Sequence, residues 1–148
     1  MIGADFKRLF FDRKAVRAKT DRATRRVLSR FGAYVRRSAR SSIRKRKRTS
    51  APGSPPSSHA GLLRKFIFFG FDLLRRSVVI GPARLSRRGR GEAPSLLEHG
   101  GTGTVAAAAR KGKAASRKRV RYRPRPYMGP ALTREKPKLP AMWRGSVK

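Results

Sequence analysis

Apolar and small side chains recur every three or four positions along the first third of the chain. Between residues 5 and 46 there is no proline and one glycine, Gly32, while Lys and Arg fill most of the remaining surface. This spacing predicts one long amphipathic helix, either continuous or broken at Gly32, that packs on a sheet or on a neighbouring subunit. Its apolar face comprises Phe6, Leu9, Val16, Thr20, Ala23, Val27, Phe31 and Tyr34.

After residue 61 the pattern changes to short apolar runs separated by turn residues. The apolar run at 62–71 predicts a buried strand, and the β-branched segment 77–82, closed by Gly-Pro, predicts its antiparallel partner. Residues 94–99 are expected to form a short strand or edge segment. Charged and apolar residues alternate over 118–123, which predicts a half-exposed strand. The packing of the sheet is assigned to Phe66, Phe68, Phe71, Val79 and Ile80.

Segments rich in proline, glycine and serine separate these elements. The helix is expected to end within the basic run 44–48, and residues 49–58 form a Pro/Ser/Gly linker. Residues 86–91 are predicted to be a polar loop. Residues 100–116, rich in Gly, Ala and Lys, are predicted to be flexible, with the glycines at the start of this segment acting as a hinge.

Prolines also organise the end of the chain. Pro130 can occupy the first turn of a short helix at 131–136. Pro137 and Pro140 are expected to interrupt that helix before the last apolar piece, residues 141–143.

These elements predict an α+β fold, in which a long N-terminal amphipathic helix packs on a small antiparallel β-sheet, with long basic loops and a short C-terminal helix. Hydrophobic residues make up 38% of the 148, which is enough for one domain with a modest core. We divide this single domain, 1–148, into a basic helix (1–48), a Pro/Ser-rich loop (49–61), a β-sheet (62–128) with a flexible insertion (100–117), and a C-terminal helical segment (129–148).

Charge is the most unusual property of the sequence. Lys and Arg number 40 against 7 Asp and Glu, a formal net charge of +33. A folded domain with this charge repels itself, so a polyanion or an acidic partner surface is expected to offset it. The residues expected to face DNA or an acidic partner are Arg44, Lys45, Arg46, Lys47, Arg48, Arg117, Lys118, Arg119, Arg121, Arg123 and Arg125.

The second basic run has two interpretations. Its cations flank Tyr122, and such a strip can follow a phosphate backbone while the ring stacks on a base. Alternatively, it is a strand whose apolar residues face the core and whose arginines face solvent or an acidic neighbour. Either contact would depend on salt and would not read base sequence.

The sequence supplies few of the groups that catalysis or metal binding requires. There is no cysteine, the two histidines are His59 and His99, and the seven acids are scattered. No nucleotide-binding P-loop is present. The apolar run 66–71 is too short to span a bilayer, and the first residues lack the apolar core of a signal peptide. We therefore expect no enzymatic activity, cofactor, metal or membrane contact, and synthesis in the cytoplasm.

Two sets of short motifs are more specific. The first runs Ala-Pro-Gly-Ser-Pro-Pro (51–56), His-Ala-Gly-Leu-Leu-Arg-Lys (59–65) and Val-Val-Ile-Gly-Pro (78–82). The second runs Leu-Leu-Glu-His-Gly-Gly (96–101) and Arg-Pro-Arg-Pro-Tyr-Met-Gly-Pro-Ala-Leu (123–132). In this order, over about residues 49–135, they resemble the phage tail-component and head–tail joining family that includes lambda minor tail protein Z-like proteins. The long insertion after Gly101 and the extreme charge depart from the family pattern.

The resemblance implies a small α+β subunit that assembles into a ring at the neck or the head-proximal end of a phage tail. Its implied partners are further copies of the chain, other neck, connector or tail proteins, and the genomic DNA that passes through the lumen. The implied location is the head–tail junction of the virion. Candidate contacts with neighbours are Pro52, Pro55, Pro56, Tyr127, Met128 and Trp143. For Tyr127, Met128 and Trp143, packing within the subunit is favoured over contact with a partner. The alternative is a non-catalytic, sequence-independent nucleic-acid-binding protein, ribosomal-like or DNA-coating.

Overall fold

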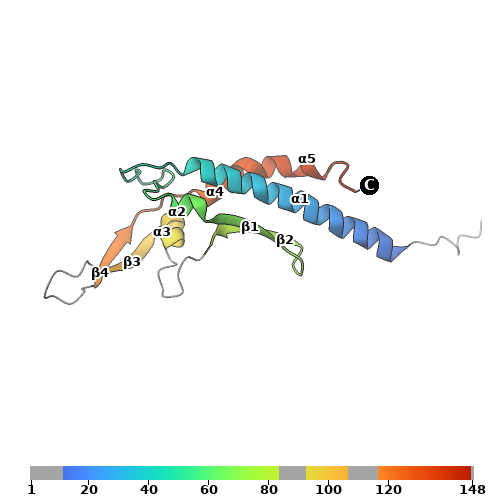
Figure 1. The fold of residues 1–148 in the computed structure, drawn as a ribbon, viewed down its shortest axis with the longest axis horizontal. Helices are drawn as coiled ribbons and strands as arrows, with labels where there is room; N and C mark the ends of the chain where they lie inside the picture. Colours follow the sequence, from blue (N-terminus) through green and yellow to red (C-terminus); the bar gives the residue numbers. More distant parts are fainter. Residues whose placement is uncertain (1–11, 84–92, 107–116, 148) are drawn as a thin grey trace, which may run out of the picture.

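The computed structural model describes residues 12–83, 93–106 and 117–147, and its elements are arranged along one long helix (Figure 1). The helices are α1 (Arg13–Ser42), α2 (Leu62–Lys65), α3 (Ala93–His99), α4 (Met128–Glu135) and α5 (Leu139–Trp143), with a 3₁₀ turn at Lys136–Lys138. The strands are β1 (Ile67–Asp72), β2 (Ser77–Pro82), β3 (Gly101–Ala106) and β4 (Arg117–Tyr122). The predicted α+β class, with a long N-terminal helix and a short C-terminal one, is confirmed.

Helix α1 is continuous and shorter than predicted. It begins after Asp12, whose carboxylate accepts a hydrogen bond from the Ala15 N–H at 2.9 Å. It ends at Ser42, before the basic run, because Ile43 adopts an extended conformation and buries its side chain. Gly32 does not break the helix. Residues 1–11, including Phe6 and Leu9 of the predicted apolar face, lie outside the described residues.

The apolar face of α1 is buried only in its central and C-terminal turns. Ala23, Val27 and Phe31 are buried as predicted. Val16 is 44% exposed, because the first turns of α1 extend past the other elements (Figure 1). Tyr34 is also exposed, because the buried face of this part of α1 runs through Val35 and Ala39, and Tyr34 lies outside it. The main core comprises Phe31, Val35, Ala39, Ile43, Ile67, Tyr127 and Ala131.

The β1–β2 hairpin packs one face on α1 and leaves the other exposed. Pairing places Phe69 opposite Ile80 and Phe71 opposite Val78 on the covered face. A Cβ atom on Gly32 would lie 2.7 Å from Val78 Cγ2, so glycine permits the close approach of helix and hairpin.

Several details of the predicted β1–β2 region were wrong. Residues 62–65 form α2 instead of the start of a strand. Phe68 and Val79, predicted to pack in the sheet, are 49% and 64% exposed because they lie on the uncovered face. Ile67, which lies in the predicted buried strand but is not among the residues assigned to the packing of the sheet, is fully buried.

The remaining strands form a second, separate two-stranded sheet, where a single sheet was predicted. Residues 94–99 are part of helix α3 and do not form a strand, because Pro94 fits a first helical turn and Gly100, at φ +74°, ends the helix. The expected glycine hinge is strand β3, in which Gly103 lies so close to α3 that a Cβ atom would be 2.7 Å from Leu96. The predicted strand at 118–123 is confirmed as β4.

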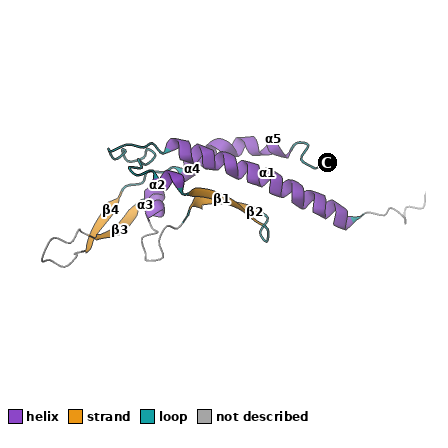
Figure 2. Cartoon of the chain, viewed as in Figure 1, coloured by secondary structure: helices purple, strands orange, loops and turns teal. Residues whose placement is uncertain are grey.

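The C-terminal helices run beside α1 (Figure 2). Pro130 lies in the first turn of α4, as predicted. The predicted interruption by Pro137 and Pro140 is confirmed, because α4 ends at Glu135 and each proline lies at the start of a further helical segment, where its missing N–H needs no partner. The predicted loop at 86–91 and most of the flexible insertion fall outside the described residues.

Candidate functional site

Glu98, at the end of α3, holds the start of helix α4. Its Oε2 atom accepts hydrogen bonds from the N–H groups of Tyr127 at 2.8 Å and Met128 at 3.0 Å, and Oε1 accepts one from Gly129 at 2.7 Å. No side chain of α4's own N-cap satisfies these donors. A carboxylate at this position also interacts favourably with the helix dipole. One acid from α3 therefore fixes the orientation of α4.

The Pro/Ser-rich loop joins the same region. The Arg125 N–H donates to the Leu97 carbonyl at 2.6 Å, and the Gly53 N–H donates to the Pro124 carbonyl at 2.9 Å. The Arg125 Nε donates to the Ser50 carbonyl at 2.9 Å. We call this set of contacts between the loop at 50–58, the end of α3 and the segment 123–129 the motif junction. It joins three of the sequence motifs identified above.

Tyr127 anchors the motif junction in the core. Its side chain is 1% exposed and belongs to the main apolar cluster. Burial, and secondarily the negative charge of Glu98, raises the pKa of Tyr127 to about 12. The phenol therefore stays protonated at neutral pH and has a structural role.

The structure separates the predicted contact residues into two groups. Pro56 and Tyr127 are buried within the chain itself, so they are unavailable to a neighbour. Pro55 and Met128 are half-buried, whereas Pro52 and Trp143 are exposed.

The two predicted basic runs lie at the end of the molecule where α1 terminates (Figure 1). All five cations of 44–48 are exposed, and Ser58 N–H donates to the Arg44 carbonyl at 3.0 Å. On β4 the cations are also exposed, whereas Val120 and Tyr122 are half-buried. Tyr122 packs beside Gly103 within its own hairpin. Arg125 differs from the other cations because it is half-buried and bonded to the loop.

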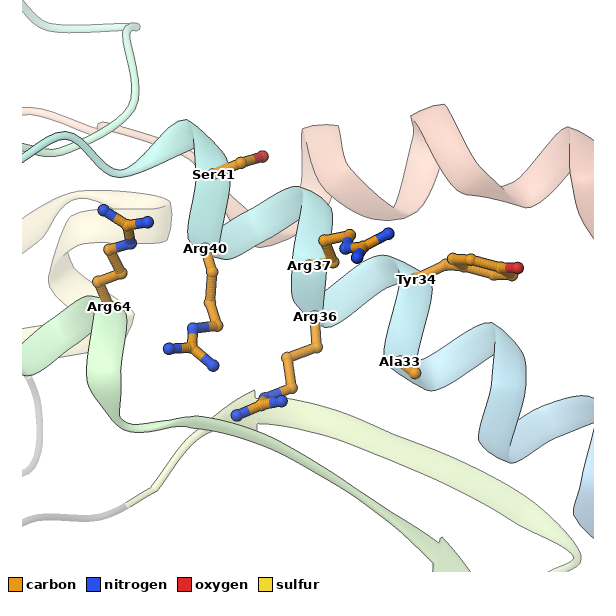
Figure 3. Close-up of a pocket in the computed structure, with 7 residues that line it drawn as sticks. All are labelled: Ala33, Tyr34, Arg36, Arg37, Arg40, Ser41 and Arg64. Atoms are coloured by element: carbon orange, nitrogen blue, oxygen red, sulfur yellow. The ribbon is translucent and has the colours of Figure 1, made fainter.

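A third cationic surface was not predicted from the sequence. An open groove of about 470 Å³ runs along the C-terminal half of α1 (Figure 3). The sequence does indicate this surface, because arginines recur at helical spacing on the side of α1 opposite the apolar face. The groove is lined by Ala33, Tyr34, Arg36, Arg37, Arg40, Ser41 and Arg64.

Acidic side chains among the described residues have roles elsewhere. Asp12 and Glu98 cap helices, and Asp72 accepts two backbone N–H bonds in the β1–β2 turn. Two ion pairs join described residues, Arg76 with Asp21 at 3.2 Å and Lys138 with Glu135 at 2.6 Å. None of the described carboxylates lines the groove on α1. The exposed arginines of α1 are therefore suited to an anionic partner.

Within the described residues, no group of three or more His, Cys, Asp or Glu side chains is arranged to hold a metal ion. His59 and His99 are both exposed and belong to separate elements. The helices of the described part of the chain include none that is long and apolar enough to cross a bilayer.

Comparison of the chain with protein-family models, with curated proteins and with solved structures finds no match. Its function must therefore be inferred from its own contacts and charge.

Proposed function

We propose that the chain is a non-enzymatic structural protein of a tailed-phage virion, a subunit of the head–tail connector, neck or tail-completion ring that joins capsid to tail around the DNA channel. The motif junction supports this proposal. Motifs separated by tens of residues, which resemble those of the head–tail joining family, meet through Glu98, Arg125 and Gly53. The motifs that carry the resemblance are therefore joined to one another by hydrogen bonds in the fold.

The shape and surface of the chain are consistent with assembly. The β3–β4 hairpin projects at one end of the molecule, and the first turns of α1 project at the other (Figure 1). The exposed face of the β1–β2 hairpin carries Phe68 and Val79, and Leu74 at its turn is 96% exposed. Such apolar surface is typical of contacts between subunits. The proposed partners are copies of the chain, other neck, connector or tail proteins, and DNA, assembled in the host cytoplasm.

Deletion of the gene from its phage, followed by negative-stain electron microscopy of the lysate, tests this function. We expect DNA-filled heads beside separate, full-length tails, and joined virions when the wild-type gene is supplied from a plasmid. Normally joined virions in the deletion lysate would refute the proposal.

The alternative, a sequence-independent nucleic-acid-binding protein outside any ring, is favoured by one observation. Only two of the many described cations form ion pairs, and most of the others are exposed. Oligomeric state at high salt with nuclease present distinguishes the two functions. Rings that persist favour the virion role, whereas monomers that release nucleic acid favour the alternative.

A further inference from the structure

Three arginines from two helices line the same groove beside α1. Figure 3 shows Arg36 and Arg40, one turn apart on α1, extending toward β1, while Arg64 of α2 runs past Arg40 in the opposite direction. Arg37 and Tyr34 point to another side of the helix (Figure 3). We call Arg36, Arg40 and Arg64 the arginine cradle. It forms one side of the groove of about 470 Å³.

Arg36 is fixed in place by β1. Its Nε atom donates a hydrogen bond to the Ile67 carbonyl at 2.7 Å, and its Cζ atom lies 5.9 Å from the centre of the Phe68 ring. A guanidinium has five N–H donors, so this contact leaves the terminal nitrogens available to a ligand. Arg40 and Arg64 form no ion pair with the described acids.

The cradle has no internal charge compensation. Among the described residues no carboxylate lines the groove, and acids of the hairpin and of α1 bind other groups, Asp72 in the β1–β2 turn and Asp21 to Arg76. Like charges along one groove are unfavourable unless an anion offsets them. The groove therefore suits an anionic partner that contacts several arginines.

The arginines continue along the exposed face of α1, beyond the cradle. Arg22, Arg25, Arg26 and Arg30 are exposed. At 1.5 Å rise per residue, the row from residue 22 to residue 40 is about 27 Å long. Duplex DNA carries a charge about every 1.7 Å, so this length matches a segment of polyanion rather than a single ion.

We propose that the arginine cradle binds a phosphate group of a nucleic-acid backbone, and that the α1 arginine row follows the same backbone. Arginine forks match the geometry of phosphate oxygens. A protein partner fits less well along the row, because the exposed side of α1 between residues 22 and 40 carries mainly arginines and lacks the apolar core of a protein–protein interface. Contacts of this kind do not read bases. The inference rests on the DNA contact in the proposed function and assigns it to a surface, and it can fail separately, since binding by the purified chain is measured whatever its place in a virion.

Binding of the full chain to a fluorescent 30-base-pair duplex, measured by anisotropy over a range of NaCl concentrations, tests this site. The variant is Arg40→Gln/Arg64→Gln, which leaves the Arg36 contact with β1 intact. The control is Lys136→Gln/Arg144→Gln, which removes two exposed charges at the C-terminal end. Thermal melting checks that both variants fold.

We expect the cradle variant to bind at least about tenfold more weakly near 0.1 M salt and to reduce the slope of log K against log salt by about two. The control should lose no more than about threefold. Arg40→Lys/Arg64→Lys should fall between the wild type and the glutamine variant, because lysine keeps the charge and loses the fork.

Equal losses for the cradle and control variants would overturn the proposal, since they would show only a general effect of charge. A competitor resolves the remaining alternative. Poly-L-glutamate, added at equal charge concentration, should displace duplex DNA poorly. If it binds as tightly as DNA and loses affinity in the cradle variant, the partner is an acidic protein surface, and the assignment to nucleic acid is wrong.

Discussion

At the scale of single residues, Glu98 shows how much one acid can contribute in a chain with few of them. Replacing it by alanine leaves the N–H groups of Tyr127, Met128 and Gly129 without their acceptor. Hydrogen bonds to a charged group are each worth about 1.5–3 kcal/mol, but water can reach part of this site, so we expect Glu98→Ala to lower the free energy of unfolding by about 3 kcal/mol. Urea denaturation measures this change.

The matched control for Glu98 is Asp21, which forms an exposed ion pair with Arg76. Asp21→Ala should cost less than about 1 kcal/mol, because exposed pairs contribute little. Equal effects of the two substitutions would show that the Glu98 cap does not hold α4.

The raised pKa of Tyr127 predicts that the stability of the fold decreases at alkaline pH. Its pKa rises from 10.0 to about 12 in the folded chain, through burial first and the charge of Glu98 second. Between these values the unfolded state loses its proton while the folded state keeps it, so stability falls as pH rises. The contribution is complete below pH 10 and is lost as pH approaches 12.

Tyr127→Phe isolates this effect from the titration of lysines, because phenylalanine keeps the packing and removes the ionisable group. Urea midpoints from pH 8 to pH 11 should fall more steeply for the wild type than for the variant. Parallel curves would show that Tyr127 ionises as easily in the folded state as in the unfolded one.

At the scale of elements, Gly32 couples α1 to the β1–β2 hairpin. An alanine Cβ atom there would lie 2.7 Å from Val78 and 2.9 Å from Phe69. Alanine gains about 1 kcal/mol in helix propensity, but forcing helix and hairpin apart costs about 1–3 kcal/mol. We therefore expect Gly32→Ala to lower stability by about 1 kcal/mol, measured by urea denaturation.

The exposed neighbour of Gly32 supplies the reference. Ala33→Gly changes helix propensity alone and should cost about 1 kcal/mol. A clear gain in stability for Gly32→Ala would mean that the hairpin moves away from α1 without penalty.

Elements whose pattern is local were predictable from the sequence. Helix α1, the β1–β2 hairpin and strand β4 follow from periodicity and β-branched content. Helix α3 was missed because the segment Ala93–His99 is too short for helical periodicity to emerge, and its helix depends on packing against Gly103. The exposure of Phe68 was missed because a strand sequence does not reveal that only one face is covered.

The motif junction and the arginine cradle were harder to predict, because each joins residues distant in sequence. Glu98 lies in the motif at 96–101 and Gly129 in the motif at 123–132, yet neither motif indicates that the Gly129 N–H donates a hydrogen bond to Glu98. Arg64 lines the same groove as Arg36 and Arg40 only because the chain returns to the side of α1 at α2 (Figure 3). The basic runs 44–48 and 117–125 could be identified from the sequence because their charges are adjacent. The arginines of α1 are instead separated by other residues, so the surface that they form depends on the helix.

At the scale of the whole molecule, charge and shape act together. The net charge of +33 is carried by an elongated arrangement in which a long helix and two hairpins spread the cations apart (Figure 1). Separation reduces repulsion, since Coulomb energy falls with distance. The same separation leaves little shared core between the β3–β4 hairpin and the rest of the chain. A partner that supplies negative charge would therefore stabilise the fold as well as bind to it.

Salt and DNA should consequently each raise the stability of the chain, but the DNA effect should disappear as the salt concentration rises. Raising NaCl from 20 to 300 mM shortens the screening length from roughly 20 Å to roughly 6 Å, so repulsion among the cations weakens and the Tm of the free chain should rise. The two ion pairs among described residues weaken too, but they are few against the net charge. A 30-base-pair duplex should raise the Tm further at 20 mM salt, with the increment disappearing at 300 mM as binding is lost. Differential scanning fluorimetry measures both responses, and a Tm of the free chain that falls with added NaCl would show that favourable ion pairs, not repulsion, dominate its electrostatics.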